Sequence, residues 1–327
     1  MAEPVRVTLF NDAGCPWGYS ANPALRVLEW RYGAQVEWRL VLIGLTDVAQ
    51  EYVDRGYTPL RSAEGYAQRF RRFGMPLAPN PRARIVGTGR SCRAIVSVRL
   101  QAPGREWAAF RALQFAFFTT TLLLDEDDGI AAALAGLEGI DVDAVIAAID
   151  TPAVEEGYQR DRAEARSAAG SPTQLQDKHA TSDGPVRYTA PSLVFEHGGR
   201  RLEAGGWQTI EAYDVIVANL IPDGERRGVP DDPRAAHRAP GRPHDPGGGA
   251  AAHPRQRRPR PNRGRSGDAT TGRRWNRYAH AARRRRSVAA HVAFRTACGA
   301  SSRDGVRSAE RMGLSPRGAF RCGLLQY

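Results

Sequence analysis

The chain has few cysteines, and their spacing argues against a fold held together by disulfides. Only four of the 327 residues are cysteines, and they stand at irregular intervals: Cys15, Cys92, Cys298 and Cys322. Domains that depend on disulfides are usually small, secreted and dense in cysteine. We therefore expect these thiols to be reduced and to form no disulfide framework.

A long apolar run is also missing. The most apolar stretch, residues 115–124, is interrupted by threonines at 119–121 and followed by acidic residues at 125–128. It is too short to cross a bilayer. Residues 1–4 lead directly into a predicted strand, without the basic and apolar regions of a signal peptide. We expect a soluble cytoplasmic protein that does not bind membranes.

Lysine is absent from residue 225 onward, where the composition changes abruptly. Residues 225–327 contain 24 arginines and 7 acidic residues, a net charge of +17. Residues 1–224 contain 23 basic and 28 acidic residues, a net charge of −5. The later segment is rich in Arg, Pro, Gly and Ala, and it lacks the apolar periodicity that would offset the entropy of ordering a chain. We therefore predict that residues 225–327 form a disordered tail.

This tail has three interpretations. Its arginines could bind the phosphates of nucleic acid or other anions without sequence preference. It could be a solvated linker. It could also be a frameshift product of GC-rich DNA, which the abrupt, lysine-free, Arg-rich composition favours. Sequencing the codons for residues 222–229 would distinguish a frameshift from a genuine tail.

A cysteine stands where a predicted strand leads into a predicted helix. Residues 5–10 alternate as in a strand, and Cys15-Pro16-Trp17-Gly18 opens a helical pattern that reaches about residue 32. Unpaired N–H groups and the helix dipole stabilise a thiolate at such a position, so we expect Cys15 to ionise more easily than a free cysteine. Gly18 occupies the place where a redox CxxC motif has its second cysteine. Cys15 therefore has no resolving partner within its own motif.

Other residues near this motif have a structural and a functional interpretation. Asp12 could influence Cys15 or accept its proton, but an Asp before a helix is more often a cap or turn residue. Trp17 and Tyr19 are expected to pack against a helical insertion in the middle of the chain rather than to contact substrate. Electropositive neighbours could activate Cys92, although a buried structural cysteine is the simpler interpretation.

The remaining pattern predicts a mixed α/β domain with a long helical region in its middle. Strands are expected at 5–10, 36–43, 192–196 and 200–203. Helices are expected at 17–32, 108–124 and 142–149, and residues 205–208 introduce a last helix that reaches about residue 220. A strand, helix and strand in this order favour a parallel pairing of the first two strands. A turn at residues 197–199 predicts a hairpin between the last two strands.

Together, the order of elements, residues 12–19, the Ala190-Pro191 pair and the Gly205-Gly206-Trp207-Gln208 segment resemble a DsbA-like thioredoxin-fold protein. The resemblance covers residues 4–220. More narrowly, the chain is similar to the cytoplasmic DsbA-like branch, whose active site usually reads Cys-Pro-Trp-Cys. The resemblance implies a thioredoxin-like fold with a helical insertion: the first part of the fold at 1–57, the insertion at 58–180 and the second part at 181–224. It gives no account of the Arg-rich tail at 225–327.

The same resemblance implies a set of site residues. Cys15 corresponds to the cysteine that attacks substrate disulfides, and Pro16, Trp17 and Gly18 complete the motif. Pro191 corresponds to the family's cis-proline beside that cysteine, and Ala190 to the residue that lines the substrate groove. The second motif cysteine has no counterpart in this chain.

These residues predict a thiol-disulfide oxidoreductase that acts through the single thiolate of Cys15. Its substrates would be protein or glutathione disulfides, and external glutathione as co-substrate, or another thiol, would resolve the mixed disulfide. One alternative is a glutathione-dependent isomerase or transferase of thioredoxin fold; another is a non-catalytic module that binds extended peptides beside Pro191. We expect no tightly bound cofactor, and no metal site, because His179 and His197 lack ligand spacing with other candidates.

Overall fold

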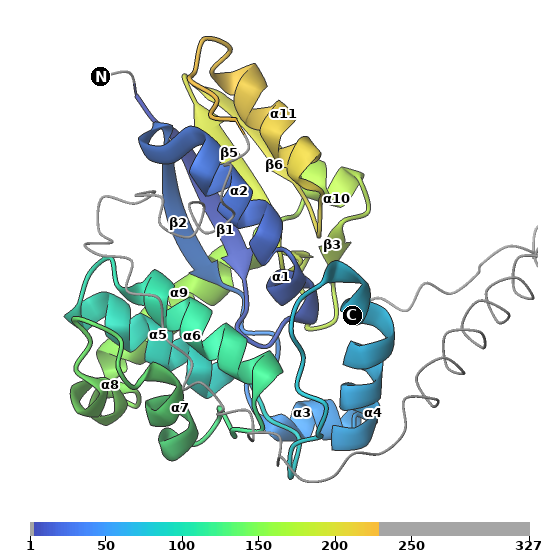
Figure 1. Cartoon of the computed structure of the whole chain (residues 1–327), viewed down its shortest axis with the longest axis vertical. Coiled ribbons are helices and arrows are strands. Elements are labelled where there is room, and N and C mark those ends of the chain that lie inside the picture. The colour runs from blue at the N-terminus through green and yellow to red at the C-terminus, as the bar shows by residue number, and fades with distance from the viewer. Residues whose placement is uncertain (1–2, 229–327) are drawn as a thin grey trace, which may run out of the picture. The chain divides into compact units, whose positions relative to one another are not determined.

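A four-stranded sheet forms the centre of the fold (Figure 1). The computed structural model describes residues 3–228. The strands lie in the order β2-β1-β5-β6, with bounds β1 Val5–Asn11, β2 Val36–Leu42, β5 Ser192–His197 and β6 Arg200–Ala204. β1 is parallel to β2 and antiparallel to β5, which is antiparallel to β6. The four strands and the parallel pairing predicted from the sequence are therefore confirmed.

The crossover from β1 to β2 contains two α-helices, followed by the short 3-10 helix η1 (Gly33–Gln35), where the sequence predicted one helix. α1 spans Pro16–Ser20 and α2 spans Asn22–Tyr32, with Ala21 between them. Pro23 has no N–H, and its ring excludes the carbonyl of Tyr19 from a continuous helix. The side chain of Asn22 donates to that carbonyl at 2.9 Å instead. The prediction of a single helix over 17–32 was wrong for this reason.

One face of the sheet carries the main apolar core. Alternate residues of β1, among them Val7 and Leu9, are fully buried on this face, as is Phe195 of β5. α2 and α11 (Ile210–Leu220) contact one another and lie side by side on this side of the sheet (Figure 1). The alternating sequence of β1 and the apolar stripe on α11 explain why the sequence pattern identified these two elements.

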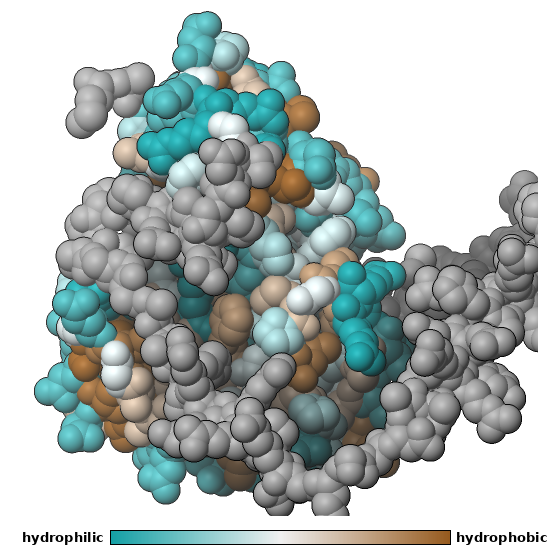
Figure 2. Space-filling model, viewed as in Figure 1, coloured by the Kyte–Doolittle hydropathy of each residue, from teal (hydrophilic) through white to brown (hydrophobic). Residues whose placement is uncertain are grey.

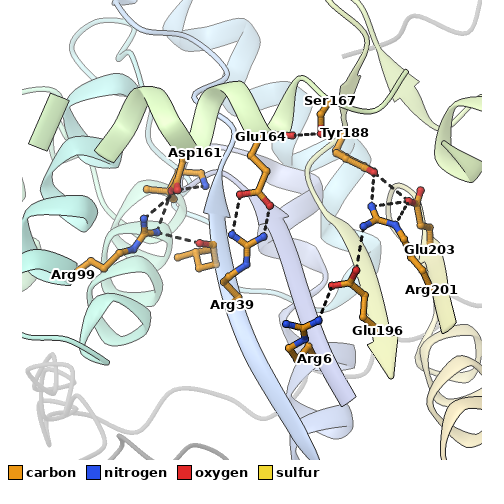
Figure 3. Close-up of polar contacts among 12 residues, drawn as sticks. Arg6, Arg39, Arg99, Asp161, Glu164, Ser167, Tyr188, Glu196, Arg201 and Glu203 are labelled. Atoms are coloured by element: carbon orange, nitrogen blue, oxygen red, sulfur yellow. Dashed lines mark hydrogen bonds and ion pairs between the residues drawn. The ribbon is translucent and has the colours of Figure 1, made fainter. Parts of the chain in front are cut away.

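Several ion pairs lie on the opposite face of the sheet (Figure 3). They join neighbouring strands and the helix α9 (Pro152–Ala165), through the pairs Arg6–Glu196 at 4.0 Å, Arg201–Glu196 at 3.4 Å, Arg201–Glu203 at 3.0 Å and Arg39–Glu164. Asp161 of α9 also pairs with Arg99 at 3.0 Å and accepts the Leu42 N–H at 3.0 Å. The contacts of Glu164 with Arg39 and of Asp161 with Leu42 fix α9 against β2.

The long region between β2 and β5 is mainly helical. Its elements are α3 Ala49–Asp54, α4 Pro59–Gly65, η2 Tyr66–Phe70, η3 Arg71–Phe73, α5 Gly89–Gln101, α6 Glu106–Thr119, α7 Asp127–Leu134, α8 Val142–Ala148, α9 and α10 Pro172–Leu175. The helix predicted to reach residue 124 ends at Thr119, because Thr120 is extended. A two-stranded ribbon, β3 (His179–Ala180) with β4 (Arg187–Tyr188), was not predicted. The part boundaries at residues 57 and 180 stay predictions.

The exposed large apolar residues are spread over several elements of the described chain. They are Val48, Val53, Leu60, Leu100, Leu175 and Val215. Figure 2 shows apolar and polar residues interspersed on the face that it draws. Within residues 3–228, no helix combines the length and the apolar character needed to cross a membrane.

The first residues of the predicted tail pack against α2 and α11. Arg226 pairs with the buried Asp214 through both of its oxygens, one contact measuring 3.0 Å. Arg31 of α2 pairs with the same carboxylate at 3.0 Å, and the backbone N–H of Arg227 donates to the Arg31 carbonyl at 3.1 Å. The prediction of disorder from residue 225 was therefore wrong for residues 225–228. The rest of the predicted tail lies outside the described residues.

We expect Arg226→Ala to lower the free energy of unfolding by about 1 kcal/mol, because it removes the hydrogen bonds to the buried Asp214 while Arg31 still faces that carboxylate. Denaturant titration of the full chain measures this. Arg160→Ala removes an exposed ion pair on α9 and should change stability by less than about 0.5 kcal/mol. Equal effects of the two substitutions would contradict the contact between Arg226 and Asp214.

Candidate functional site

Cys15 is the N-cap of α1, in the turn that follows β1. Its backbone is extended, and Pro16 occupies the first turn of the helix, where a missing N–H costs no hydrogen bond. The N–H of Gly18 donates to the Cys15 Sγ at 3.5 Å. The structure therefore has the strand, turn and helix N-terminus that the sequence predicted around this cysteine.

The loop before β5 brings Ala190 and Pro191 to Cys15. The Ala190–Pro191 peptide bond is cis. The Cys15 Sγ–H donates to the Ala190 carbonyl at 3.2 Å, across 175 residues of sequence. The antiparallel pairing of Phe10 with Ser192 sets the ends of β1 and β5 side by side. Three of the predicted site residues therefore meet in space, while their roles in catalysis and substrate binding stay predictions.

The thiol of Cys15 lies in an apolar environment. Only 5% of the residue is exposed. It belongs to a buried cluster with Phe10, Val41, Ile43, Ala165, Ala168, Tyr188, Ala190 and Val194. This burial raises the pKa of Cys15 to about 12; the Gly18 N–H lowers the pKa, and the negative charge of Asp12 raises it further. The expectation of an easily ionised thiol was therefore wrong, because desolvation outweighs the helix N-terminus.

This burial predicts the pH dependence of Cys15 alkylation. We expect the rate of reaction with iodoacetamide to rise continuously up to pH 10, because the thiolate fraction keeps growing until the pH reaches the pKa of about 12. Mass spectrometry of the peptide that contains Cys15 measures the rate. The urea-unfolded chain is the control, and its rate should level off above about pH 8.5. A plateau below pH 8 in the folded protein would contradict the burial of this thiol.

Asp12 organises the turn between β1 and α1. Its carboxylate accepts the N–H of Gly14 at 2.8 Å, the N–H of Leu45 at 2.9 Å and the hydroxyl of Thr88 at 3.0 Å. The thiol of Cys92 donates to the same carboxylate at 3.6 Å. The side chain is fully buried. Asp12 thus serves as a turn residue that also ties the start of α5 and the end of β2 to the motif.

Cys92 is fully buried in α5. Burial raises its pKa well above the ordinary value, and the negative charge of Asp12 acts in the same direction. The positive charge of Arg93 lowers the pKa by less. These contacts support the structural interpretation of Cys92 over activation by its electropositive neighbours.

Aromatic residues from three segments gather around Trp17. Trp17 meets Phe70 edge to face, with ring centroids 5.0 Å apart, and Phe73 at 5.9 Å. Phe73 in turn contacts Trp207 at 4.8 Å. The guanidinium of Arg72 lies 5.9 Å from the Trp17 ring. We call Trp17, Phe70, Phe73 and Trp207 the aromatic cover of the site.

The aromatic cover was only partly predicted. Packing of Trp17 against the insertion was expected and is confirmed, as is that of Tyr19, which stacks on Phe118 at 4.7 Å. Phe70, Phe73 and Trp207 were not connected with the site. These residues lie far from Trp17 in the chain, and no spacing rule relates residues at such separations. Their sequence positions therefore did not indicate that they meet in space.

Within the described part of the chain, no group of three or more His, Cys, Asp or Glu residues is placed to hold a metal ion. His179 lies 4.0 Å from Asp177. His197 ends β5. These positions provide no metal-binding constellation.

Comparison with known proteins identifies a family that this chain matches. Residues 6–189, more than half of the chain, match the family of DSBA-like thioredoxin domains. No curated protein matches the chain. A solved structure of a putative protein disulfide isomerase from Nitrosomonas europaea is 17% identical, has a TM-score of 0.50, and aligns over 68% of this chain and 99% of its own. That likeness shows a shared fold.

Two further solved structures are similar. A probable DsbA oxidoreductase from Streptomyces coelicolor is 17% identical, with a TM-score of 0.49 and coverage of 69% of this chain and 94% of its own. The cytosolic disulfide reductase DsbM from Pseudomonas aeruginosa is 15% identical, with a TM-score of 0.41 and coverage of 67% of this chain and 93% of its own.

Proposed function

The chain belongs to the DSBA-like thioredoxin domain family, and we propose that it is a thiol-disulfide oxidoreductase that acts through the single thiol of Cys15. One observation carries the proposal. The Cys15 Sγ lies at the N-terminus of α1 and 3.2 Å from the carbonyl of Ala190, next to the cis peptide of Pro191. Gly18 supplies no second thiol within the motif, and in the proposed reaction an external thiol takes that part.

The reaction consists of two thiol-disulfide exchanges. The Cys15 thiolate attacks the glutathione sulfur of a mixed disulfide, forms a Cys15–glutathione disulfide and releases the substrate thiolate, which takes up a proton. A glutathione thiolate then attacks the glutathione sulfur bound to Cys15, which releases the Cys15 thiolate and oxidised glutathione. The net reaction consumes one mixed disulfide and one glutathione. It yields one substrate thiol and one oxidised glutathione.

Charge next to the aromatic cover supports glutathione as the co-substrate. Arg71 and Arg72 are exposed, and the Arg72 guanidinium lies over the rings of Trp17 and Phe73. Glutathione carries two carboxylates, which an exposed guanidinium can bind by paired hydrogen bonds. A reducing compartment such as the cytoplasm would supply this thiol and drive the exchange towards reduction.

The burial of Cys15 favours a second candidate function. A thiol that is 5% exposed, with its pKa raised to about 12, carries little thiolate at neutral pH. In this second candidate the chain is a peptide-binding module, in which the loop at Ala190 and Pro191 binds an extended segment and Cys15 stays idle. The two functions differ in whether Cys15 forms a covalent intermediate.

We expect Cys15→Ser to reduce the rate of glutathione-dependent reduction of a glutathionylated peptide by at least about 100-fold, because the nucleophile is lost. Release of oxidised glutathione, followed with glutathione reductase and NADPH, measures the rate. Cys92→Ser is the matched control: it replaces another buried cysteine and should keep at least half of the activity.

The outcome of this experiment separates the two candidates. A Cys15–glutathione adduct in the mass spectrum of the unsubstituted protein would support the oxidoreductase. If the unsubstituted chain exchanges no faster than glutathione alone, and if Cys15→Ser binds an extended peptide as tightly as the unsubstituted chain, the oxidoreductase proposal fails in favour of the binding module.

A further inference from the structure

The place of the missing second thiol is filled by another side chain. A Cβ atom added at Gly18 would lie 2.0 Å from the Oδ1 of Asn11, 2.9 Å from its Cγ and 3.1 Å from its Nδ2. Carbon and oxygen atoms that are not bonded to each other do not approach to 2.0 Å. Any side chain at position 18 therefore requires Asn11 to move.

Asn11 has little freedom to move. It is the last residue of β1, pairs in register with Leu42 of β2, and its carbonyl accepts the Ile43 N–H at 2.9 Å. Its side chain is fully buried, and the Oδ1 accepts the Asp12 N–H at 2.8 Å. The backbone hydrogen bonds hold the Cα, and the surrounding core confines the carboxamide.

The other end of this carboxamide lacks a partner. The Nδ2 of Asn11 is buried and makes no hydrogen bond among the described residues. Burying an unpaired amide donor is unfavourable. A polar side chain in this position is therefore not explained by its contribution to packing alone.

We propose that Asn11 is a specificity-determining residue that keeps this site a one-thiol site. Its carboxamide occupies the space that a side chain at position 18 needs, so a cysteine placed there cannot sit beside Cys15 in the geometry of a disulfide. This inference rests on the proposed function, because it states why the reaction uses an external thiol rather than a second cysteine. It predicts that restoring the motif cysteine alone does not restore two-thiol chemistry.

The first test measures disulfide formation at the motif in the full chain. We compare Gly18→Cys with the double substitution Asn11→Ala/Gly18→Cys after equilibration with reduced and oxidised glutathione, acid quenching and alkylation. Mass spectrometry of the motif peptide measures the fraction that contains a disulfide between Cys15 and the cysteine introduced at position 18. We expect an equilibrium constant for this disulfide at least about tenfold larger in the double variant. A disulfide that forms to the same measurable extent in both variants would overturn the proposal.

The second test needs no thiol chemistry. Gly18→Ala, Asn11→Ala and the double variant Asn11→Ala/Gly18→Ala form a double-mutant cycle, read as thermal unfolding midpoints. We expect Gly18→Ala to lower the midpoint by roughly 5 °C, because it overpacks the site. We expect the double variant to lose less than the sum of the two single losses. Additive losses would overturn the proposal.

Gly65→Ala is the control for the second test. Gly65 is also helical, and a Cβ added there would meet no atom within 4 Å. Alanine at that position should leave the midpoint unchanged or raise it slightly, because alanine favours helices. If the alanine cycle shows coupling while neither cysteine variant forms a disulfide, the steric role of Asn11 stands and the thiol-exchange function of Cys15 fails. The two failures are therefore distinguishable.

Discussion

The antiparallel pairing of β1 with β5 is the constraint on which the candidate site depends. Cys15 follows the end of β1, and Pro191 precedes the start of β5, so the register of Phe10 with Ser192 decides whether they meet. A slip of one residue would turn the side chains of a strand to the opposite face of the sheet. Because both strands lie inside the sheet and alternate buried residues on its core face, the register is fixed by the core. The contact of Cys15 with Ala190 therefore follows from packing far from the thiol.

Two opposing effects set the ionisation of Cys15, and burial is the larger. The N-terminus of α1 offers the Gly18 N–H to the sulfur, which lowers the pKa, but the sulfur is also enclosed by apolar side chains and lies near the buried Asp12. The turn between β1 and α1 depends on Asp12, because its carboxylate accepts hydrogen bonds from Gly14, Leu45 and Thr88. The carboxylate that stabilises the turn thus disfavours the thiolate. A substrate that donates a hydrogen bond to the sulfur, or lets water reach it, would shift this balance.

The sequence predicted the features that depend on local pattern. β1 was identified by its alternating residues, β2 by its β-branched residues, and β5 and β6 by the turn at residues 197–199 that joins them. The ribbon of β3 and β4 was missed, since two residues are too few to show a period. The sign of the Cys15 pKa shift was also missed. The residues that bury the thiol, among them Tyr188 and Val194, come from a segment far along the chain, and no local rule places them beside it.

The absence of a thiol at position 18 has a different meaning in the structure than in the sequence. In the sequence, Gly18 is a single replaced residue, which one substitution could reverse. In the structure, Asn11 fills the same space from the end of β1, where the pairing with Leu42 and the hydrogen bond to Ile43 hold its backbone. The one-thiol character of the site is therefore built into the sheet as well as into the motif. A close packing contact of this kind couples two positions so that each restricts what the other can be, since protein interiors leave few voids into which a displaced side chain could move.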